Sequence, residues 1–209
     1  MKTFAIFDFD KTIISKDSFR IFSFLAAKNL FEKTFILYYT LLCHFSFITN
    51  KEYKKYLLEK LWSGLSVKDK NRLNQMLFEK LTALLNIKII SSLKKHLENG
   101  DNVVVLSASP EFYLVPFIYN IDDKIRVFGS RVTQRIDGVD IQNLYKQKKA
   151  DVAKEIISEC PTIKNVIVYT DHIDDYPLIK LASKVVLVKP KKTLVKYVSD
   201  LNIPFEKFI

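Results

Sequence analysis

Ile6-Phe7-Asp8-Phe9-Asp10-Lys11-Thr12-Ile13-Ile14 is the stretch that decides the fold of this 209-residue chain. It continues an apolar run, Phe4 to Phe7, that has the length and composition of a buried strand. Two carboxylates one residue apart, Asp8 and Asp10, then interrupt the run. Side chains at i and i+2 lie on the same side of a strand, and two like charges that close need a cation or a shared proton. The stretch therefore predicts a strand that ends in a reactive site, and a solvated strand end is the less favoured alternative.

The composition excludes several classes of protein. Hydrophobic residues make up 48% of the chain, which is too many for a disordered protein. The four glycines stand alone, so the sequence contains neither a G-x-G-x-x-G fingerprint nor a Walker loop. Cys43 and Cys160 fit no metal or disulfide spacing, and the three histidines form no zinc pattern. Two unpaired cysteines predict a reducing compartment.

The sequence also predicts a cytoplasmic protein without a transmembrane segment. The first strand begins almost at Met1, which leaves no room for a signal peptide. The longest apolar run, Phe35 to Ile48, contains His44 and is shorter than the roughly 18 residues that span a bilayer.

The formal net charge of +10 raises the question of an anionic partner. Only five of the 33 basic residues are arginines, whereas base-edge readout and bidentate phosphate recognition favour arginine over lysine. A dispersed lysine coat is more typical of a solvated surface, so we do not expect nucleic acid as a partner. Peripheral contact with an anionic membrane surface stays open.

The pattern of apolar residues predicts an α/β fold, a doubly wound parallel sheet of Rossmann-like type with an inserted helical bundle. Residues 3–9 form the first strand, and residues 15–85 then carry helical periodicity that indicates about four helices. Strands and helices alternate afterwards, with a hairpin that turns at Asp137-Gly138. The expected strands there cover residues 102–106, 125–128, 166–169 and 185–188, and the expected helices residues 88–97, 111–119, 148–159 and 176–182. We therefore expect an α/β core made of residues 1–14 and 86–209.

In an open parallel sheet, ligands bind beyond the C-terminal ends of the strands. The strand that begins at Asn102 ends in Ser107-Ala108-Ser109-Pro110, where hydroxyls and free N–H groups suit a phosphate oxygen. Taken alone, the segment is better explained by an ordinary serine N-cap. The strand that begins at Val166 ends in Thr170-Asp171-His172-Ile173-Asp174-Asp175, whose three carboxylates favour a hard cation, with a capped acidic turn as the alternative.

Lys149 is the most informative single residue. On the expected helix 148–159, Val152, Ala153, Ile156 and Ile157 define the apolar stripe. Lys149 falls near the centre of that stripe at about 100° per residue, and a lysine in the first turn opposes the helix dipole. A lysine placed there either extends outward to solvent or meets a buried anion.

In chain order, these segments resemble the four motifs of the haloacid dehalogenase superfamily of phosphohydrolases. The matches are Asp8-Phe9-Asp10-Lys11-Thr12, Ser107-Ala108-Ser109-Pro110, Lys149, and Asp171 through Asp175. The helical insert directly after the first motif resembles the phosphoserine-phosphatase-like branch, in which this insert is a cap. The resemblance thus implies a core with a cap made of residues 15–85.

The resemblance also implies a role for each matching residue. Asp8 would be the nucleophile that forms an aspartyl-phosphate, and Asp10 the general acid and base. Mg²⁺ would be held by Asp8, the backbone carbonyl of Asp10, and Asp171. The remaining implied roles are the binding of phosphoryl oxygens by Thr12, Ser107, Ala108 and Lys149, and the orientation of Lys149 by Asp175.

Two positions depart from that pattern. Thr170-Asp171-His172 stands where many members have Gly-Asp-Ser or Gly-Asp-Gly, and His172 is expected either to line the pocket or to face solvent. Asp17 stands where phosphoserine phosphatases carry a glutamate that binds the substrate amine. The substrate is therefore an unassigned phosphomonoester, a small molecule or a lipid.

Three alternatives remain at this point. One is a phosphatase for lipid phosphates such as phosphatidylglycerophosphate at a membrane surface. It is suggested by aromatic residues of the insert, among them Phe19, Phe22, Phe24, Phe31, Phe35, Tyr38, Tyr39, Phe45, Phe47 and Trp62. These aromatics would equally pack the core of the insert itself. The others are a non-catalytic binder of phosphorylated ligands or nucleic acid, and phosphotransfer to an acceptor other than water. The oligomeric state is left open.

Overall fold

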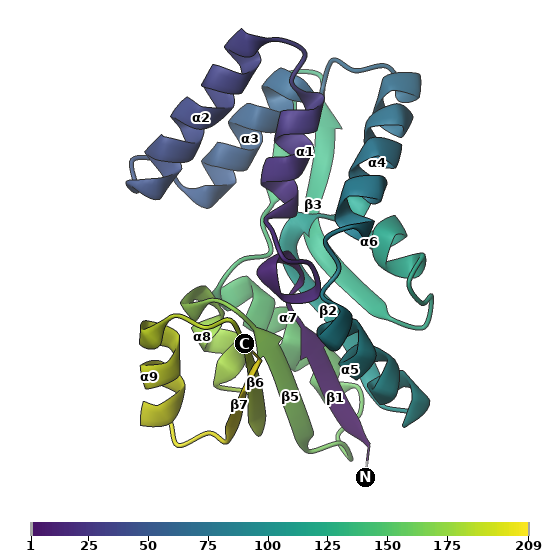
Figure 1. Ribbon diagram of the computed structural model, residues 1–209, viewed down its shortest axis with the longest axis vertical. Coiled ribbons are helices and arrows are strands. Elements are labelled where there is room, and N and C mark those ends of the chain that lie inside the picture. Colours follow the sequence, from purple (N-terminus) through teal and green to yellow (C-terminus); the bar gives the residue numbers. More distant parts are fainter. Residues whose placement is uncertain (1, 209) are drawn as a thin grey trace.

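A computed structural model describes residues 2–208, which form a seven-stranded sheet with helices on both faces (Figure 1). The sheet order is β4-β3-β2-β1-β5-β6-β7, and every neighbouring pair is parallel except β3 and β4. Chain order runs outward in both directions from β1, so the topological switch point lies at β1. The strands are β1 (Thr3–Phe7), β2 (Asn102–Pro110), β3 (Arg126–Arg135), β4 (Gly138–Gln142), β5 (Asn165–Thr170), β6 (Lys184–Val188) and β7 (Phe205–Phe208).

The central strands are buried on both faces, as their unbroken apolar runs predict. Ala5 and Phe7 point to the face that is covered by α5 (Ile87–Glu98) and α6 (Glu111–Tyr119). Phe4 and Ile6 point to the opposite face, which α7 (Gln147–Ser158) covers. The remaining elements of the C-terminal half are α8 (Tyr176–Ile179), α9 (Lys192–Asp200) and the 3₁₀ turn η2 (Ile173–Asp175). The predicted fold class is confirmed.

Four helices are inserted between β1 and α5, as the sequence predicted. They are α1 (Ser18–Ala26), α2 (Leu30–His44), α3 (Asn50–Leu61) and α4 (Val67–Thr82). Figure 1 shows them beyond the C-terminal end of β1, next to the β3–β4 hairpin. The two connections to this insert pair with each other, because Ser15 N donates to Leu84 O and Asn86 N donates to Ile13 O, both at 2.8 Å.

Three features of the sheet differ from the expectation. The strand expected at residues 102–106 runs through Pro110, so Ser107-Ala108-Ser109-Pro110 form the end of β2 and do not follow it. The strand expected at residues 125–128 does not stop before the hairpin: β3 runs on through Arg135, and its last five residues pair antiparallel with β4. Residues after Val188 add α9 and a parallel edge strand, β7, neither of which was expected. The sequence Phe205-Glu206-Lys207-Phe208 has no apolar face, so its local pattern does not predict a strand. The strand forms because these residues pair with β6. Within residues 2–208, no helix has the length and apolar character that crossing a membrane requires.

Candidate active site

The end of β1 places the two aspartates of the first motif. Asp8 follows the last residue of β1, and its N–H donates to Tyr169 O of β5 at 2.9 Å. The chain then turns through η1 (Phe9–Ile13), in which Lys11 adopts a φ of 58°. This turn separates the two carboxylates, so that Asp8 faces α7 while Asp10 faces α1 and the end of β2.

Lys149 reaches the site from the first turn of α7 and is only 4% exposed. Its Nζ lies 2.7 Å from Asp8 Oδ1 and 2.8 Å from Asp175 Oδ1. The second oxygen of Asp175 accepts a hydrogen bond from Thr170 Oγ1 at 2.6 Å. Asp175 thus holds Lys149 in place beside Asp8. Of the two alternatives for Lys149, the structure shows the one in which the lysine is buried and meets an anion.

More negative charge gathers here than Lys149 balances. Burial raises the pKa of Asp8 well above its usual value, Lys149 opposes this rise, and Asp175 and Asp171 add to it. Burial also raises the pKa of Asp171, which the charges of Lys11 and His172 partly offset. For Lys149, burial lowers the pKa, but Asp175 and Asp8 raise it further, so its net pKa lies above the ordinary value. The site is therefore short of positive charge.

A divalent cation would supply the positive charge that the site around Asp8 lacks. No group of three His, Cys, Asp or Glu side chains within residues 2–208 is arranged to hold a metal ion. The set implied by the sequence needs only two such side chains, Asp8 and Asp171, because the third ligand is the backbone carbonyl of Asp10. The Asp10 carboxylate is turned to Ser18 and Ser109, which agrees with a carbonyl ligand. Oxygen donors with excess negative charge are the donor set that Mg²⁺ prefers.

The Asp10 carboxylate is held by neutral donors. Ser18 N donates to Asp10 Oδ1 at 2.6 Å, and Ser109 Oγ donates to Asp10 Oδ2 at 2.5 Å. The Ser18 hydroxyl also lies within hydrogen-bond distance of Ser109 Oγ (2.8 Å) and Tyr113 Oη (3.1 Å). Burial and the charge of Asp17 raise the pKa of Asp10 to about 6, although both hydrogen bonds act against the rise. Asp10 can therefore carry a proton close to neutral pH.

The other predicted binding residues have different surroundings. Ser107 is buried, and its Oγ accepts a hydrogen bond from Ser109 N at 3.0 Å. The Ala108 carbonyl accepts hydrogen bonds from Lys54 Nζ and Ser130 Oγ, so it is occupied by the protein itself. Thr12 is fully buried, and its Oγ1 has no hydrogen-bond partner within the described part of the chain. The structure thus brings Asp8, Asp171, Asp175 and Lys149 together, whereas it leaves the contacts of Thr12, Ser107 and Ala108 with a ligand as predictions.

Lys54 is the residue that sequence reasoning missed. It lies on α3 of the insert, is 4% exposed, and its Nζ donates to Ala108 O and, at 2.9 Å, to Asn143 Oδ1. Burial lowers the pKa of Lys54 to about 8, although Asp10 and Asp17 act to raise it. Its neighbours on the buried stripe of α3 are Leu57, Leu58 and Leu61. The signal that identified Lys149, a lysine on an apolar stripe, was therefore present at Lys54 as well.

Residues 5–180 match the family of haloacid dehalogenase-like hydrolases. The chain belongs to this family. The matched range contains the four motif segments and the helical insert, and the resemblance noted in the sequence is confirmed. No protein with a curated description matches this hydrolase in sequence.

Solved structures share the fold over nearly the whole hydrolase. A protein of unknown function from Bordetella pertussis Tohama I superposes with a TM-score of 0.85 at 14% identity, and 98% of each chain is covered. A substrate-bound phosphoserine phosphatase gives a TM-score of 0.72 at 13% identity, over 94% of this chain and 90% of that one. A phosphoserine phosphohydrolase-like protein from Francisella tularensis gives 0.63 at 21% identity, over 100% and 95%. These similarities extend to the helical insert, so its position after β1 is a property of the shared fold.

Proposed function

We propose that this hydrolase is a Mg²⁺-dependent phosphatase that cleaves phosphomonoesters through an aspartyl-phosphate at Asp8. The observation that carries the proposal is the position of Lys149 Nζ, 2.7 Å from Asp8 and 2.8 Å from Asp175, at the C-terminal edge of the sheet. A buried lysine that is held by a second carboxylate beside a nucleophilic one can neutralise the oxygens of a phosphoryl group.

The proposed reaction has two steps. An Asp8 oxygen attacks phosphorus, the P–O bond of the ester breaks, and the leaving oxygen takes the proton of Asp10. Asp10, now ionised, accepts a proton from water while the water oxygen attacks phosphorus and the bond to Asp8 breaks. The pKa of Asp10 near 6 supports both roles, because the carboxyl group can hold and release a proton close to neutral pH.

Asp8, Asp171 and the carbonyl of Asp10 would hold Mg²⁺, which supplies charge neutralisation for the phosphoryl oxygens when bound. Ser107, Thr12 and the backbone at Ala108 would orient the phosphoryl group. The unpartnered Thr12 hydroxyl supports this role, because a buried polar atom without a partner is costly.

We also propose that α1–α4 form the cap of residues 15–85 over a core of residues 1–14 and 86–209. Among the polar contacts that would hold the cap closed are those of Lys54 with Ala108 O of β2 and of Ser18 N with Asp10. Both contacts lie at residues that surround the proposed leaving-group acid. A substrate would then have to reach Asp8 past groups that the cap itself contributes.

Hydrolysis of an aryl phosphate tests the chemistry. We expect turnover with Mg²⁺, loss of turnover with a chelator, and no detectable turnover for Asp8→Asn. The matched control is Asp137→Asn, which makes the same chemical change in the exposed hairpin turn and should leave the rate unchanged. Metal-independent turnover, or an active Asp8→Asn variant, contradicts the mechanism.

A second candidate function, hydrolysis of a lipid phosphate at a membrane surface, is favoured by one observation on α2. Phe19 and Phe22 pack in the core, as aromatic residues of a small bundle should. Other apolar side chains of α2 and the following loop are exposed, and these are Leu30, Phe31, Leu37, Tyr38, Leu41, Phe45 and Phe47. An outward apolar surface on a strongly basic protein fits an interface with anionic lipid.

Co-sedimentation with vesicles tests this second candidate. We expect binding to phosphatidylglycerol vesicles that weakens when Phe31 and Phe45 are both changed to serine. The control is the exposed pair Lys94→Gln and Lys154→Gln, which lowers the net charge without changing α2. Loss of binding in the lysine variant together with unchanged binding of the serine variant would mean that the lysine coat alone binds the vesicles, and would exclude α2.

A further inference from the structure

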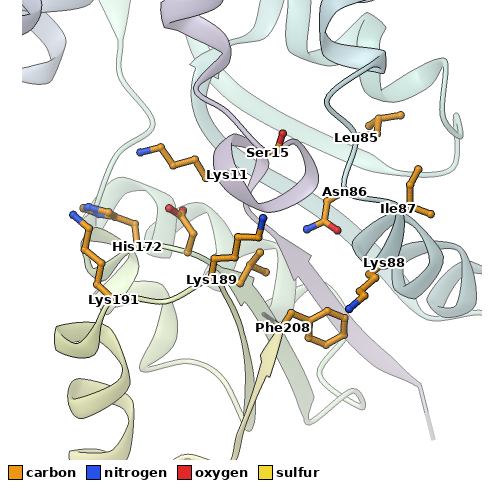
Figure 2. A pocket seen from close by; sticks show the side chains of 12 residues that line it. Lys11, Ser15, Leu85, Asn86, Ile87, Lys88, His172, Lys189, Lys191 and Phe208 are labelled. Atoms are coloured by element: carbon orange, nitrogen blue, oxygen red, sulfur yellow. The ribbon is translucent and has the colours of Figure 1, made fainter.

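A cavity of about 530 Å³ lies beside the proposed catalytic site, and four lysines are among the side chains that line it (Figure 2). This volume falls within the about 300–1,000 Å³ that small-molecule sites occupy. Its wall is formed by η1, the start of α5, the loop after β5, the loop after β6 and the end of β7. The ionisable side chains in the wall are Lys11, Lys88, Lys189, Lys191, Asp171 and His172.

The charge of this cavity is unbalanced. Four lysines face one carboxylate, and that carboxylate, Asp171, belongs to the proposed metal site. Within residues 2–208, none of the four lysines has an ion pair with a carboxylate closer than 4.0 Å. Figure 2 shows that they extend from different parts of the wall, so no single surface helix accounts for their proximity. Such a concentration of positive charge in a hollow attracts an anion.

The backbone supports the same interpretation. Lys11 and Lys189 both have positive φ, 58° and 42°, a region that costs free energy for a residue with a side chain. Lys189 directly follows β6, and its N–H donates to Phe208 O of β7 at 2.8 Å, which fixes the loop. Two strained lysines on two separate loops therefore border the same cavity.

The position relative to Asp8 defines the kind of site. Lys189 and Lys191 follow β6, Asp171 follows β5 and Asp8 follows β1, and these three strands are parallel neighbours. The cavity thus lies along the same edge of the sheet as the nucleophile. Asp171 of the proposed metal site lines the cavity, whereas Asp8, Ser107 and Lys149 are not among its lining residues. An anion in the cavity would therefore be different from the phosphoryl group that Asp8 attacks.

We propose that this lysine-lined cavity is a second phosphate-binding site, separate from the phosphoryl group at Asp8. Phosphate suits several separated ammonium groups, because its oxygens accept charge-assisted hydrogen bonds in different directions. The bound phosphate has two chemically equivalent sources: a distal phosphate of the substrate or free inorganic phosphate. In either case, phosphate binding there needs no metal, since the lysines supply the charge.

Binding of inorganic phosphate in the absence of Mg²⁺, followed by calorimetry, tests the proposal. Without a cation the catalytic carboxylates repel phosphate, so the cavity is the site that is measured. We expect one phosphate per chain, an affinity that falls with salt, and weakening by about tenfold or more in Lys189→Gln/Lys191→Gln. The control variant Lys94→Gln/Lys154→Gln has the same net charge as Lys189→Gln/Lys191→Gln and should bind phosphate like wild type.

Absence of binding would overturn the proposal. Equal weakening in both double variants would also overturn it, because that result would assign the binding to the lysine coat as a whole. These measurements require no turnover, so they remain informative if the hydrolase fails to cleave phosphomonoesters.

A kinetic arm with Mg²⁺ separates the two sources of phosphate. The substrates are hexyl phosphate and 1,6-hexanediol bisphosphate, which differ only in the distal phosphate, together with shorter members of the diol series. The compared quantity is the kcat/KM of the bisphosphate divided by that of the monophosphate. If this ratio is about tenfold in wild type and near twofold in Lys189→Gln/Lys191→Gln, the site binds the distal phosphate of the substrate. A ratio near twofold in both proteins, with metal-free binding intact, assigns it to free phosphate.

Discussion

Two lysines buried to the same 4% exposure, Lys149 of the core and Lys54 of the insert, have pKa values that are shifted in opposite directions. Lys149 lies between two carboxylates, and its pKa is raised above its ordinary value despite burial. Lys54 contacts only a carbonyl and an amide oxygen, and burial lowers its pKa to about 8. Burial by itself thus favours the neutral amine, and the partner atoms decide whether a buried lysine keeps its charge.

This difference separates two functions. Lys149 provides a permanent positive charge that a phosphoryl group can use. Lys54 connects α3 of the insert to the end of β2. Ser130 Oγ lies within hydrogen-bond distance of the same two oxygens, Ala108 O and Asn143 Oδ1, and its single proton can serve one of them. Loss of Lys54 would therefore leave one of those oxygens with a protein donor. The four predictions that follow test this distinction, from the largest expected effect to the smallest.

Lys149→Ala should lower kcat/KM for an aryl phosphate by about 10³–10⁵-fold, because phosphoryl transfer depends on fixed positive charge. Lys148→Ala, the adjacent exposed lysine of α7, should be close to wild type. The two rates are measured side by side under saturating Mg²⁺. A more sensitive Lys148 would mean that the helical phase of α7 does not determine the catalytic lysine.

Asp10→Asn should lower kcat by about 10²–10⁴-fold, because the amide retains the size of the side chain and cannot transfer a proton. Asp10 is held by Ser18 N and Ser109 Oγ and not by a lysine, so the substitution leaves the Lys149 pair intact. Mg²⁺-dependent stabilisation of the variant, measured as a shift in Tm, should therefore persist. Loss of that shift would make the Asp10 side chain a metal ligand.

Asp175→Asn should lower activity by about 10–100-fold, the usual cost of removing a group that orients a ligand-binding residue. The change leaves Lys149 with Asp8 as its only carboxylate partner among the contacts described. With weaker support from negative charge, the pKa of Lys149 should fall, so the rate of the variant should decline at a lower pH than that of wild type. An unchanged rate and an unchanged pH profile would exclude the positioning role of Asp175.

Lys54→Met should change turnover by less than about tenfold but should alter the pH dependence of stability. Since the pKa of Lys54 is about 8 in the folded protein and higher in the unfolded chain, the unfolded chain binds more protons between pH 8 and 10. The free energy of unfolding of wild type should therefore rise with pH in that window relative to Lys54→Met. Lys55→Met, at an exposed neighbour on α3, is the control and should show no such difference. A parallel pH dependence for wild type and Lys54→Met would mean that Lys54 is not desolvated.

The sequence by itself determined the fold class and the principal charged residues of the candidate site. Periodicity located the strand before Asp8 and the four inserted helices, because each buries an apolar face that local spacing records. The same spacing identified Lys149, since a charge on an apolar stripe must meet a partner. Parallel strand ends then predicted that Asp8 and Asp171 would lie near each other.

Only the tertiary structure decided which groups from distant segments meet. Lys54 and Asn143 come together because α3 of the insert packs against the β3–β4 hairpin, and no local pattern encodes that approach. Strand β7 exists because β6 offers it a paired edge, and its own sequence has no clear apolar face. The lysine cavity likewise forms from five separate segments. Each of these features depends on long-range contacts, whose geometry is fixed by packing of the whole chain and not by the spacing of neighbouring residues.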